Sequence, residues 1–142
     1  MSGSTERLTI PPTDLHQQVG QTFVSNLFVV DQARIDAFAK VTEDEQFIHV
    51  DPEQARLTPF GGTVAHGFLT LSLLSPMAYS ALPKVEGATI GVITASTACA
   101  FRTPCAPAPE WQLTYEVSVE IEGAHKPALA ATWLTMQVTG TP

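Results

Sequence analysis

The sequence predicts an α+β domain in which an antiparallel sheet wraps around one central hydrophobic helix. The helix is expected over residues 68–81, where no position carries a charge. A helix on a protein surface has a charged or polar face, so a helix without one is expected to be buried on nearly all sides. Strand-like segments follow at residues 89–100, 111–121 and 128–139, and the connections between them favour antiparallel pairing.

The chain has the length and apolar content of a single domain spanning residues 1–142. Its 142 residues include 44% hydrophobic side chains, which is enough for one core and leaves no room for a second domain. Among the expected strands, residues 111–121 alternate most clearly, with Leu113, Tyr115 and Val117 separated by polar residues. That period of two is typical of a strand with one buried and one solvated face.

Charge and composition argue against several classes of function. The formal net charge is −7, from 14 acidic and 7 basic residues, whereas nucleic acids and anionic membranes attract clustered Lys and Arg. Thr70 and Ser72 interrupt the apolar run, so no stretch reaches the roughly 20 residues of a membrane-spanning helix. With only 2 cysteines and no secretory signal at its start, the chain is expected to be cytoplasmic and to bind neither nucleic acid nor membrane.

A lead-in, a strand and a helix are expected in the first part of the chain. Residues 1–20 contain Pro11-Pro12 and are expected to pack over the surface. Residues 21–30 are rich in β-branched and aromatic side chains, which predicts a strand. Asp31 is a suitable N-cap for a helix over residues 32–40, whose apolar stripe is expected to lie against the sheet.

Three carboxylates in a row precede a histidine in the next polar segment. A solvated acidic loop is the simpler interpretation, and Asp51 fits it as the N-cap of a short helix. That interpretation leaves the apolar pair Phe47 and Ile48 unexplained, because the pair lies between Asp44 and His49. Two adjacent large apolar residues suggest that the segment folds back against the protein, which would bury Asp44 and His49.

A glycine loop leads into the apolar helix. Gly61-Gly62 permits positive φ or the close approach of a ligand, but the loop lacks the Lys and Ser/Thr ending of a phosphate loop. His66 and Gly67 open the helix, where free N–H groups and the helix dipole favour a developing anion. Pro76 cannot donate a helical hydrogen bond and is expected to bend the helix near Ser75. Ser75 is either an inward hydrogen-bonding residue or a helix filler.

The spacing around the histidine resembles a known motif. Asp44, four residues, His49, one apolar residue and Asp51 follow the hydratase motif of the MaoC-like dehydratases, the (R)-specific enoyl-CoA hydratases of hot-dog fold. The sequence Thr-Val-Ala-His-Gly at residues 63–67 is similar to the segment that leads into that family's central helix. The nodulation-protein-N-like branch is the most similar, and the likeness runs from residue 31 to residue 75 without a gap.

The resemblance implies a single hot-dog domain that hydrates trans-2-enoyl-CoA thioesters to (R)-3-hydroxyacyl-CoA and catalyses the reverse dehydration. It implies an acyl-CoA thioester as the substrate, no cofactor and no metal. A homodimer is expected as well, because a sheet of this size leaves an edge strand exposed. The implied site consists of the catalytic pair Asp44 and His49, the oxyanion donor Gly67, the supporting residue Ser75, and the substrate-binding candidates His66 and Phe47.

These residue types suit that chemistry independently of the family. Adding water to an enoyl thioester needs a base, an acid and donors for the enolate-like oxygen. We expect Asp44 to be the general base and His49 to orient the water and shuttle its proton, while the Gly67 amide polarises the thioester carbonyl. The sequence leaves the division of labour between Asp44 and His49 open.

Three other functions fit parts of the pattern. His49, Asp51 and His66 could ligate a metal, although no short two-histidine helical motif is present. A hot-dog protein that binds acyl thioesters without turning them over is the main rival, because residues 92–96 replace the branch's Asn-Tyr-Gly step with Val-Ile-Thr-Ala-Ser. An acyl-CoA thioesterase would be expected to carry a carboxylate near the apolar helix, and residues 68–81 have none.

Overall fold

The computed structural model describes residues 7–96, 99–100 and 111–139. Backbone contacts group the chain into two compact units, which we call the helical unit, Ser25–Ser80, and the sheet unit, Met1–Val24 with Ala81–Pro142. Each unit has its own secondary structure and hydrogen bonds. The organisation as one domain stays a prediction.

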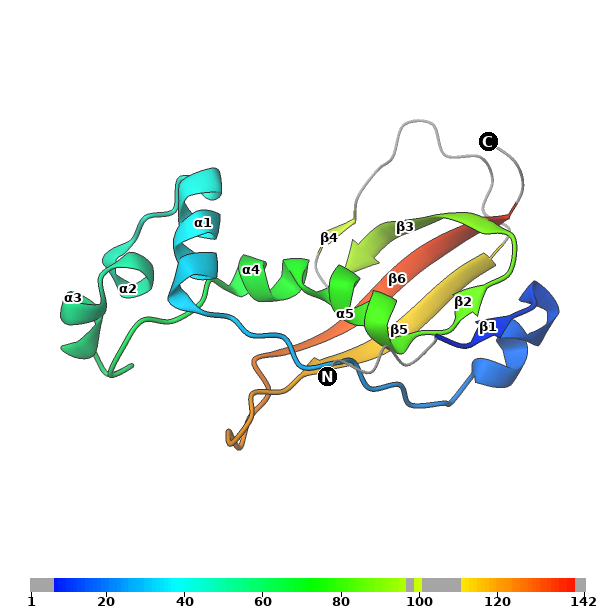
Figure 1. Ribbon diagram of the computed structural model, residues 1–142, viewed down its shortest axis with the longest axis horizontal. Helices are drawn as coiled ribbons and strands as arrows, with labels where there is room; N and C mark the ends of the chain where they lie inside the picture. Colours follow the sequence, from blue (N-terminus) through cyan, green and yellow to red (C-terminus); the bar gives the residue numbers. More distant parts are fainter. Residues whose placement is uncertain (1–6, 97–98, 101–110, 140–142) are drawn as a thin grey trace. The chain divides into compact units, whose positions relative to one another are not determined.

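The sheet unit contains a four-stranded antiparallel sheet, as the sequence pattern predicts. Its strands are β3 (Ala88–Ser96), β4 (Cys99–Ala100), β5 (Trp111–Val119) and β6 (Leu129–Thr139), in the order β4-β3-β6-β5. Strand β6 therefore pairs with β3 on one side and with β5 on the other (Figure 1). The combination of helices with this sheet confirms the α+β class. The segment between the expected strands at residues 89–100 and 111–121 lies outside the described residues.

Strand β5 confirms the predicted alternation. The apolar residues from Leu113 to Val119 are half-buried, and the polar residues between them are exposed. Tyr115 lies opposite Trp133 of β6, with ring centroids 6.1 Å apart, and burial raises the pKa of Tyr115 above its ordinary 10.0. The strand ends earlier than predicted, because its pairing with β6 stops at Val119 and leaves Ile121 exposed.

The N-terminal lead-in contributes to the core, which corrects the expectation that it only covers the surface. Strand β1 (Thr9–Ile10) pairs in parallel with β2 (Lys84–Val85), and a 3₁₀ helix, η1 (Pro12–Gln18), follows β1. The side chains of Ile10, Leu15 and Val85 are buried together. Pro12 is compatible with this helix because it stands at the first position, where its missing N–H removes no helical hydrogen bond.

The helical unit is built from short helices. They are α1 (Gln32–Thr42), α2 (Phe47–Val50), α3 (Pro52–Arg56), α4 (Gly67–Ser72) and α5 (Leu74–Ala81). Asp31 caps α1 as predicted, since its carboxylate accepts the backbone N–H of Arg34 at 2.9 Å. No helix in the described part of the chain has both the length and the apolar character needed to cross a membrane.

Residues 21–30 form no strand, in contrast to the prediction from their β-branched side chains. Val24, Leu27 and Val29 are all exposed. A strand is stabilised by cross-strand pairing and burial more than by propensity, and the sheets of the described residues do not include this segment.

The apolar segment at residues 68–81 is interrupted. Helix α4 ends at Ser72, Leu73 is its C-cap, and α5 begins at Leu74. The interruption lies just before the predicted bend at Ser75. Its position follows from Pro76, which has no N–H to donate to the carbonyl one turn earlier.

Burial along this segment also differs from the prediction. Leu69 and Leu74 are buried, but Phe68 and Tyr79 are exposed, at 72% and 66%. Within the helical unit, the expectation of burial on nearly all sides therefore does not hold for these two side chains. Absence of charge indicates an apolar surface, and folded proteins leave much apolar surface exposed. The wrapping of the sheet around this segment stays a prediction.

Asp51 caps α3, as the sequence predicts. One carboxylate oxygen accepts the backbone N–H groups of Glu53 and Gln54, both at 3.0 Å, and the other accepts the Gln54 side-chain amide at 2.7 Å. The backbone and side-chain hydrogen bonds from Gln54 lower the pKa of Asp51 below its ordinary 3.8. The cap is therefore strongest when Asp51 is ionised.

This shift predicts how the stability of the protein depends on pH. The folded-state pKa of Asp51 lies below the unfolded value, so its contribution is present above about pH 3.8 and is lost as the pH falls through the folded value. In Asp51→Asn the cap carries no charge, because Asn caps helices without ionising. We expect the difference in unfolding free energy between wild type and Asp51→Asn to shrink on acidification. Urea titrations at neutral and acidic pH measure it, and an unchanged difference would contradict the cap.

Candidate active site

Asp44, His49 and His66 lie together in the helical unit. A carboxylate oxygen of Asp44 and one ring nitrogen of each histidine all lie within 4.8 Å of one another. The two imidazole rings stack, with centroids 3.7 Å apart and 25° between their planes. Both histidines are buried, at 9% exposure for His49 and 3% for His66. The predicted pair is thus accompanied by a second histidine.

The end of α1 determines the position of Asp44. Glu43 adopts the left-handed conformation, with φ of 59°, and the N–H groups of Glu43 and Asp44 both donate to the Ala39 carbonyl. A cap of this kind turns the chain away from the helix axis. The turn leaves the Asp44 side chain 57% exposed, so the predicted burial of this carboxylate is wrong.

Two hydrogen bonds with Val64 hold His49 in place. The Val64 N–H donates to the Ile48 carbonyl at 3.0 Å, and His49 Nδ1–H donates to the Val64 carbonyl at 2.6 Å. A carbonyl oxygen only accepts, so this bond places a proton on Nδ1 and leaves the lone pair of the neutral ring on Nε2. The predicted folding back of this segment is correct for His49, whereas Phe47, the first residue of α2, is 41% exposed.

His66 stands at the N-cap position of α4. Its Nε2–H donates to the backbone carbonyl of Asp44 at 2.9 Å, which leaves its lone pair on Nδ1. This buried Nδ1 has no hydrogen-bond partner among the described residues. The ring also contacts Phe38 of α1, with centroids 5.0 Å apart. His66 therefore links the start of α4 to Asp44, His49 and α1.

The other predicted site residues lie on α4 and α5. Gly67 directly follows His66, so its N–H belongs to the first helical turn, where amides have no partner within the helix. Apart from its chain neighbours and the backbone of its own helix, no described heavy atom lies within 4 Å of the place that a Cβ on Gly67 would take. Packing among the described residues does not require glycine there. Ser75 is half-buried on α5, and the hydrogen bonds of Asp44, His49 and His66 do not include it.

Asp44, His49 and His66 also offer the ligand types of a transition-metal site. Each histidine donates one ring N–H to a carbonyl, as metal-binding histidines usually do. The ring stack argues against a shared ion, however. The lone pairs lie in ring planes only 25° apart, so they run side by side instead of converging on one ion at about 2.0 Å. Asp51, the third member of the metal set considered from sequence, serves as the cap of α3.

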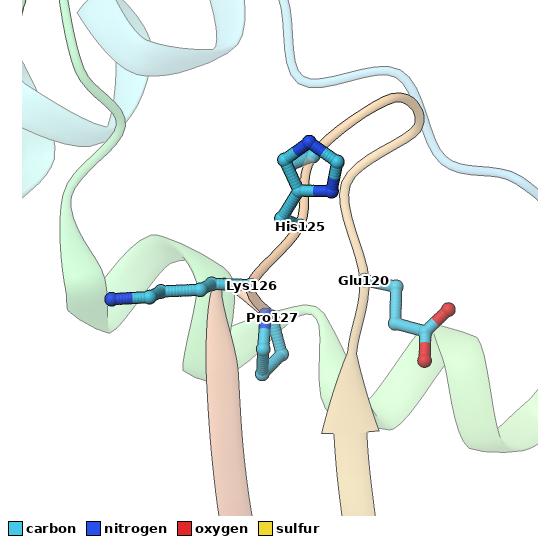
Figure 2. A pocket seen from close by; sticks show the side chains of 5 residues that line it. Glu120, His125, Lys126 and Pro127 are labelled. Carbon is cyan, nitrogen blue, oxygen red and sulfur yellow. The ribbon is translucent and has the colours of Figure 1, made fainter.

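A second polar region lies in the sheet unit, at the turn between β5 and β6. Glu120, Ala124, His125, Lys126 and Pro127 line a cavity of about 180 Å³ there (Figure 2). All of these residues are exposed, and the side chains of Glu120 and Lys126 point away from each other. The lining therefore lacks the converging polar groups of a catalytic site.

The sequence did not predict the groups that hold the backbone and the ring of His49. The Gln32 side chain donates to the His49 carbonyl at 2.7 Å and accepts the Thr63 hydroxyl at 2.6 Å. The supporting bond to the His49 ring comes from the main chain of Val64, which residue type cannot reveal. For Thr63 a signal was present, because it begins the segment similar to the MaoC-like dehydratases. For Gln32, the only signal in the sequence was that a polar residue stands near the start of a predicted helix.

A buried, oriented histidine beside an accessible carboxylate is an arrangement suited to acid–base chemistry. Residues 14–133 match the MaoC like domain. The chain is 43% identical to Nodulation protein N of Rhizobium leguminosarum bv. viciae, in an alignment that covers 88% of this chain and 87% of that protein. It is 33% identical over 132 residues to 3-hydroxyacyl-thioester dehydratase Z of Mycobacterium tuberculosis, covering 81% and 85%. This chain therefore belongs to the MaoC-like dehydratase family.

A further relative is a 3-hydroxybutyryl-CoA dehydratase of Methylorubrum extorquens. It is 29% identical to this chain over 103 residues, which cover 72% of this chain and 62% of that protein. Two of these three relatives thus carry names that state a dehydration of a 3-hydroxyacyl thioester, while the name Nodulation protein N states no reaction.

Proposed function

We propose that this protein hydrates trans-2-enoyl-CoA thioesters to (R)-3-hydroxyacyl-CoA and catalyses the reverse dehydration. The names of two relatives support a dehydratase or hydratase activity. The coenzyme A thioester and the (R) configuration are the finer parts of the proposal, and they rest on the motif from Asp44 to Asp51 and its resemblance to the (R)-specific hydratases.

The observation that carries the proposal is the spacing between Asp44 and His49. A carboxylate oxygen of Asp44 lies within 4.8 Å of a ring nitrogen of His49. One water molecule spans such a gap with two hydrogen bonds of about 2.7 to 3.0 Å. His49 is fixed by its bond to Val64, and Asp44 is accessible, so a water and a substrate can both reach the carboxylate.

The chemistry follows from these two groups. Asp44 removes a proton from the water as the water oxygen forms a bond to C3 of the enoyl thioester. His49 accepts a hydrogen bond from the water at Nε2 and orients it. Once the water oxygen is bonded to C3, the proton passes from Asp44 to His49 Nε2, which delivers it to C2. The net change is the addition of one water molecule, and both residues return to their starting states. Dehydration uses the same groups in reverse.

Charge also develops on the thioester oxygen as water adds. The Gly67 N–H, in the first turn of α4, is the donor that we assign to this oxygen, because it has no helical partner and lies next to His66. We further propose the hot-dog arrangement, in which the sheet covers α4 and α5, and a supporting role for Ser75. His66 and Phe47 complete the proposed substrate-binding set.

A direct assay tests the function. Purified protein is mixed with crotonyl-CoA and longer trans-2-enoyl-CoA thioesters, and loss of the enoyl absorbance is followed with and without a chelator. We expect turnover without any added cofactor, the same rate in the chelator, and an (R)-3-hydroxy product in chiral analysis. An (S) product would contradict the stereochemical part, and loss of activity in the chelator would contradict the metal-free mechanism.

The two rival functions are distinct outcomes of the same experiment. Acyl-CoA binding by calorimetry, with no turnover of any enoyl thioester, would favour a protein that binds acyl thioesters without converting them. Release of free coenzyme A from saturated acyl-CoA would indicate a thioesterase.

We also propose that the protein is a homodimer. Several large apolar side chains of the helical unit outside α4 and α5 are more than 60% exposed, namely Leu27, Val29, Val41, Leu57 and Phe60. Pairing with a second copy would remove such surface from water. Light scattering is expected to give twice the chain mass, and a monomer throughout the micromolar range would refute the dimer.

A further inference from the structure

The Gln32 side chain connects three separate parts of the helical unit. Gln32 is the first residue of α1, and its Nε2 donates to the His49 carbonyl at 2.7 Å and to Asp36 Oδ1 at 2.7 Å. Its Oε1 accepts the Thr63 hydroxyl at 2.6 Å. Both N–H groups and the carbonyl of this amide are therefore engaged, and they reach α1, α2 and the loop before α4.

Two of these contacts involve the backbone and loop that hold the His49 ring. Thr63 precedes Val64, whose carbonyl accepts His49 Nδ1–H and whose N–H donates to the Ile48 carbonyl. The Nε2 atom of Gln32 thus donates to the peptide carbonyl of His49, and its Oε1 accepts from the loop that orients the His49 ring. A shift of that loop would change the direction of the Nε2 lone pair.

We propose that Gln32 is a positioning residue, which acts through Thr63 and the His49 peptide to orient the His49 imidazole. The inference rests on the proposed function, in which His49 Nε2 orients the attacking water. Only a neutral amide fits the three contacts, because Gln32 donates to two acceptors and accepts from one donor. A carboxylate at this position would face the His49 carbonyl and the Asp36 carboxylate without a proton to donate.

A simpler interpretation is a local hydrogen bond on a helix surface. The Gln32–Asp36 contact is of that kind, since the two residues are four positions apart on α1. Asp36→Ala removes this contact and leaves those with His49 and Thr63, so it is the matched control. Gln32→Met keeps the length of the side chain and removes all three contacts, and Thr63→Val removes one hydroxyl at nearly constant shape.

The experiment has two readouts. The first is kcat and KM with a trans-2-enoyl-CoA for which the wild type is active. The second is a ¹⁵N NMR spectrum of the histidine rings, which reports the population of the His49 tautomer with its proton on Nδ1. The chain has 4 histidines, so the ring signals can be assigned by substitution.

We expect Gln32→Met and Thr63→Val to lower kcat, by up to about 100-fold if the ring moves by an ångström, with KM unchanged. The same variants should lower the population of the Nδ1–H tautomer of His49, whereas Asp36→Ala matches the wild type in both readouts. The double variant should be no worse than Gln32→Met alone, because Thr63 acts through the same amide.

Wild-type kcat together with a wild-type His49 tautomer in both Gln32→Met and Thr63→Val would overturn the proposal. If the wild type turns over no enoyl thioester, the proposed function fails, and the NMR readout alone decides whether Gln32 positions His49. If Gln32→Met does not fold by circular dichroism, Thr63→Val provides the same test, with the same two deciding outcomes.

Discussion

Replacing Asp44 with Asn is expected to lower the turnover of a trans-2-enoyl-CoA by roughly 10² to 10⁴, the usual effect of losing a positioned acid or base. Asn keeps the size of the side chain and can still accept a hydrogen bond, but it cannot take a proton from water. His66 should stay in place, because its Nε2–H donates to the main-chain carbonyl of Asp44 at 2.9 Å, whereas the Asp44 carboxylate lies farther from Nε2, at 3.9 Å. Steady-state kinetics measure the change, and calorimetry shows whether the substrate still binds.

Glu45→Gln is the matched control for Asp44→Asn. It neutralises the adjacent carboxylate, which is also exposed, so it changes the net charge of the segment equally. We expect wild-type turnover from this variant. Full activity in Asp44→Asn would remove the proposed mechanism, and an equal loss in both variants would assign the effect to the charge of the segment.

His49→Gln is expected to lower turnover by a comparable factor, roughly 10² to 10⁴, since Gln has no ring nitrogen that can accept and pass on a proton. His16→Gln is its control, because His16 Nδ1 also lies 2.6 Å from a carbonyl, that of Thr13, but in the sheet unit. Thermal unfolding must accompany the kinetics, because His49→Gln also removes the stack with His66.

Combining Asp44→Asn with His49→Gln should be little worse than either single substitution. Groups that act on one water molecule are non-additive, whereas independent groups multiply their effects. A double variant whose loss equals the product of the two single losses would show that Asp44 and His49 do not share a water.

The sequence was most informative where a local rule decides the structure. Asp31 and Asp51 were predicted as N-caps and are N-caps, because a cap depends on residues three positions away at most. The alternation of β5 was likewise readable, because a paired strand with one solvated face fixes which residues are polar. The resemblance to the hydratase motif predicted that Asp44 and His49 lie together, and their functional groups lie within 4.8 Å of each other.

Features that depend on main-chain conformation or on pairing with other segments could not be predicted from the sequence. The exposure of Asp44 follows from the left-handed conformation of Glu43. Glutamate rarely adopts this conformation, so its residue type does not predict it. The support of His49 by Val64 uses main-chain atoms, which every residue type shares. The strand expected at residues 21–30 failed for a related reason, since propensity cannot supply a partner strand.

The two histidines are oriented by main-chain carbonyls, those of Val64 and Asp44, and this affects how such a protein can change during evolution. A mutation of the Asp44 codon would remove the carboxylate while both imidazoles kept their anchors. Under the proposed function, a descendant changed in this way would lose catalysis and still keep both imidazoles and the helices that carry them. On the proposed role of Asp44, the side chain at position 44 would separate active from inactive members of such a lineage better than the degree of sequence identity.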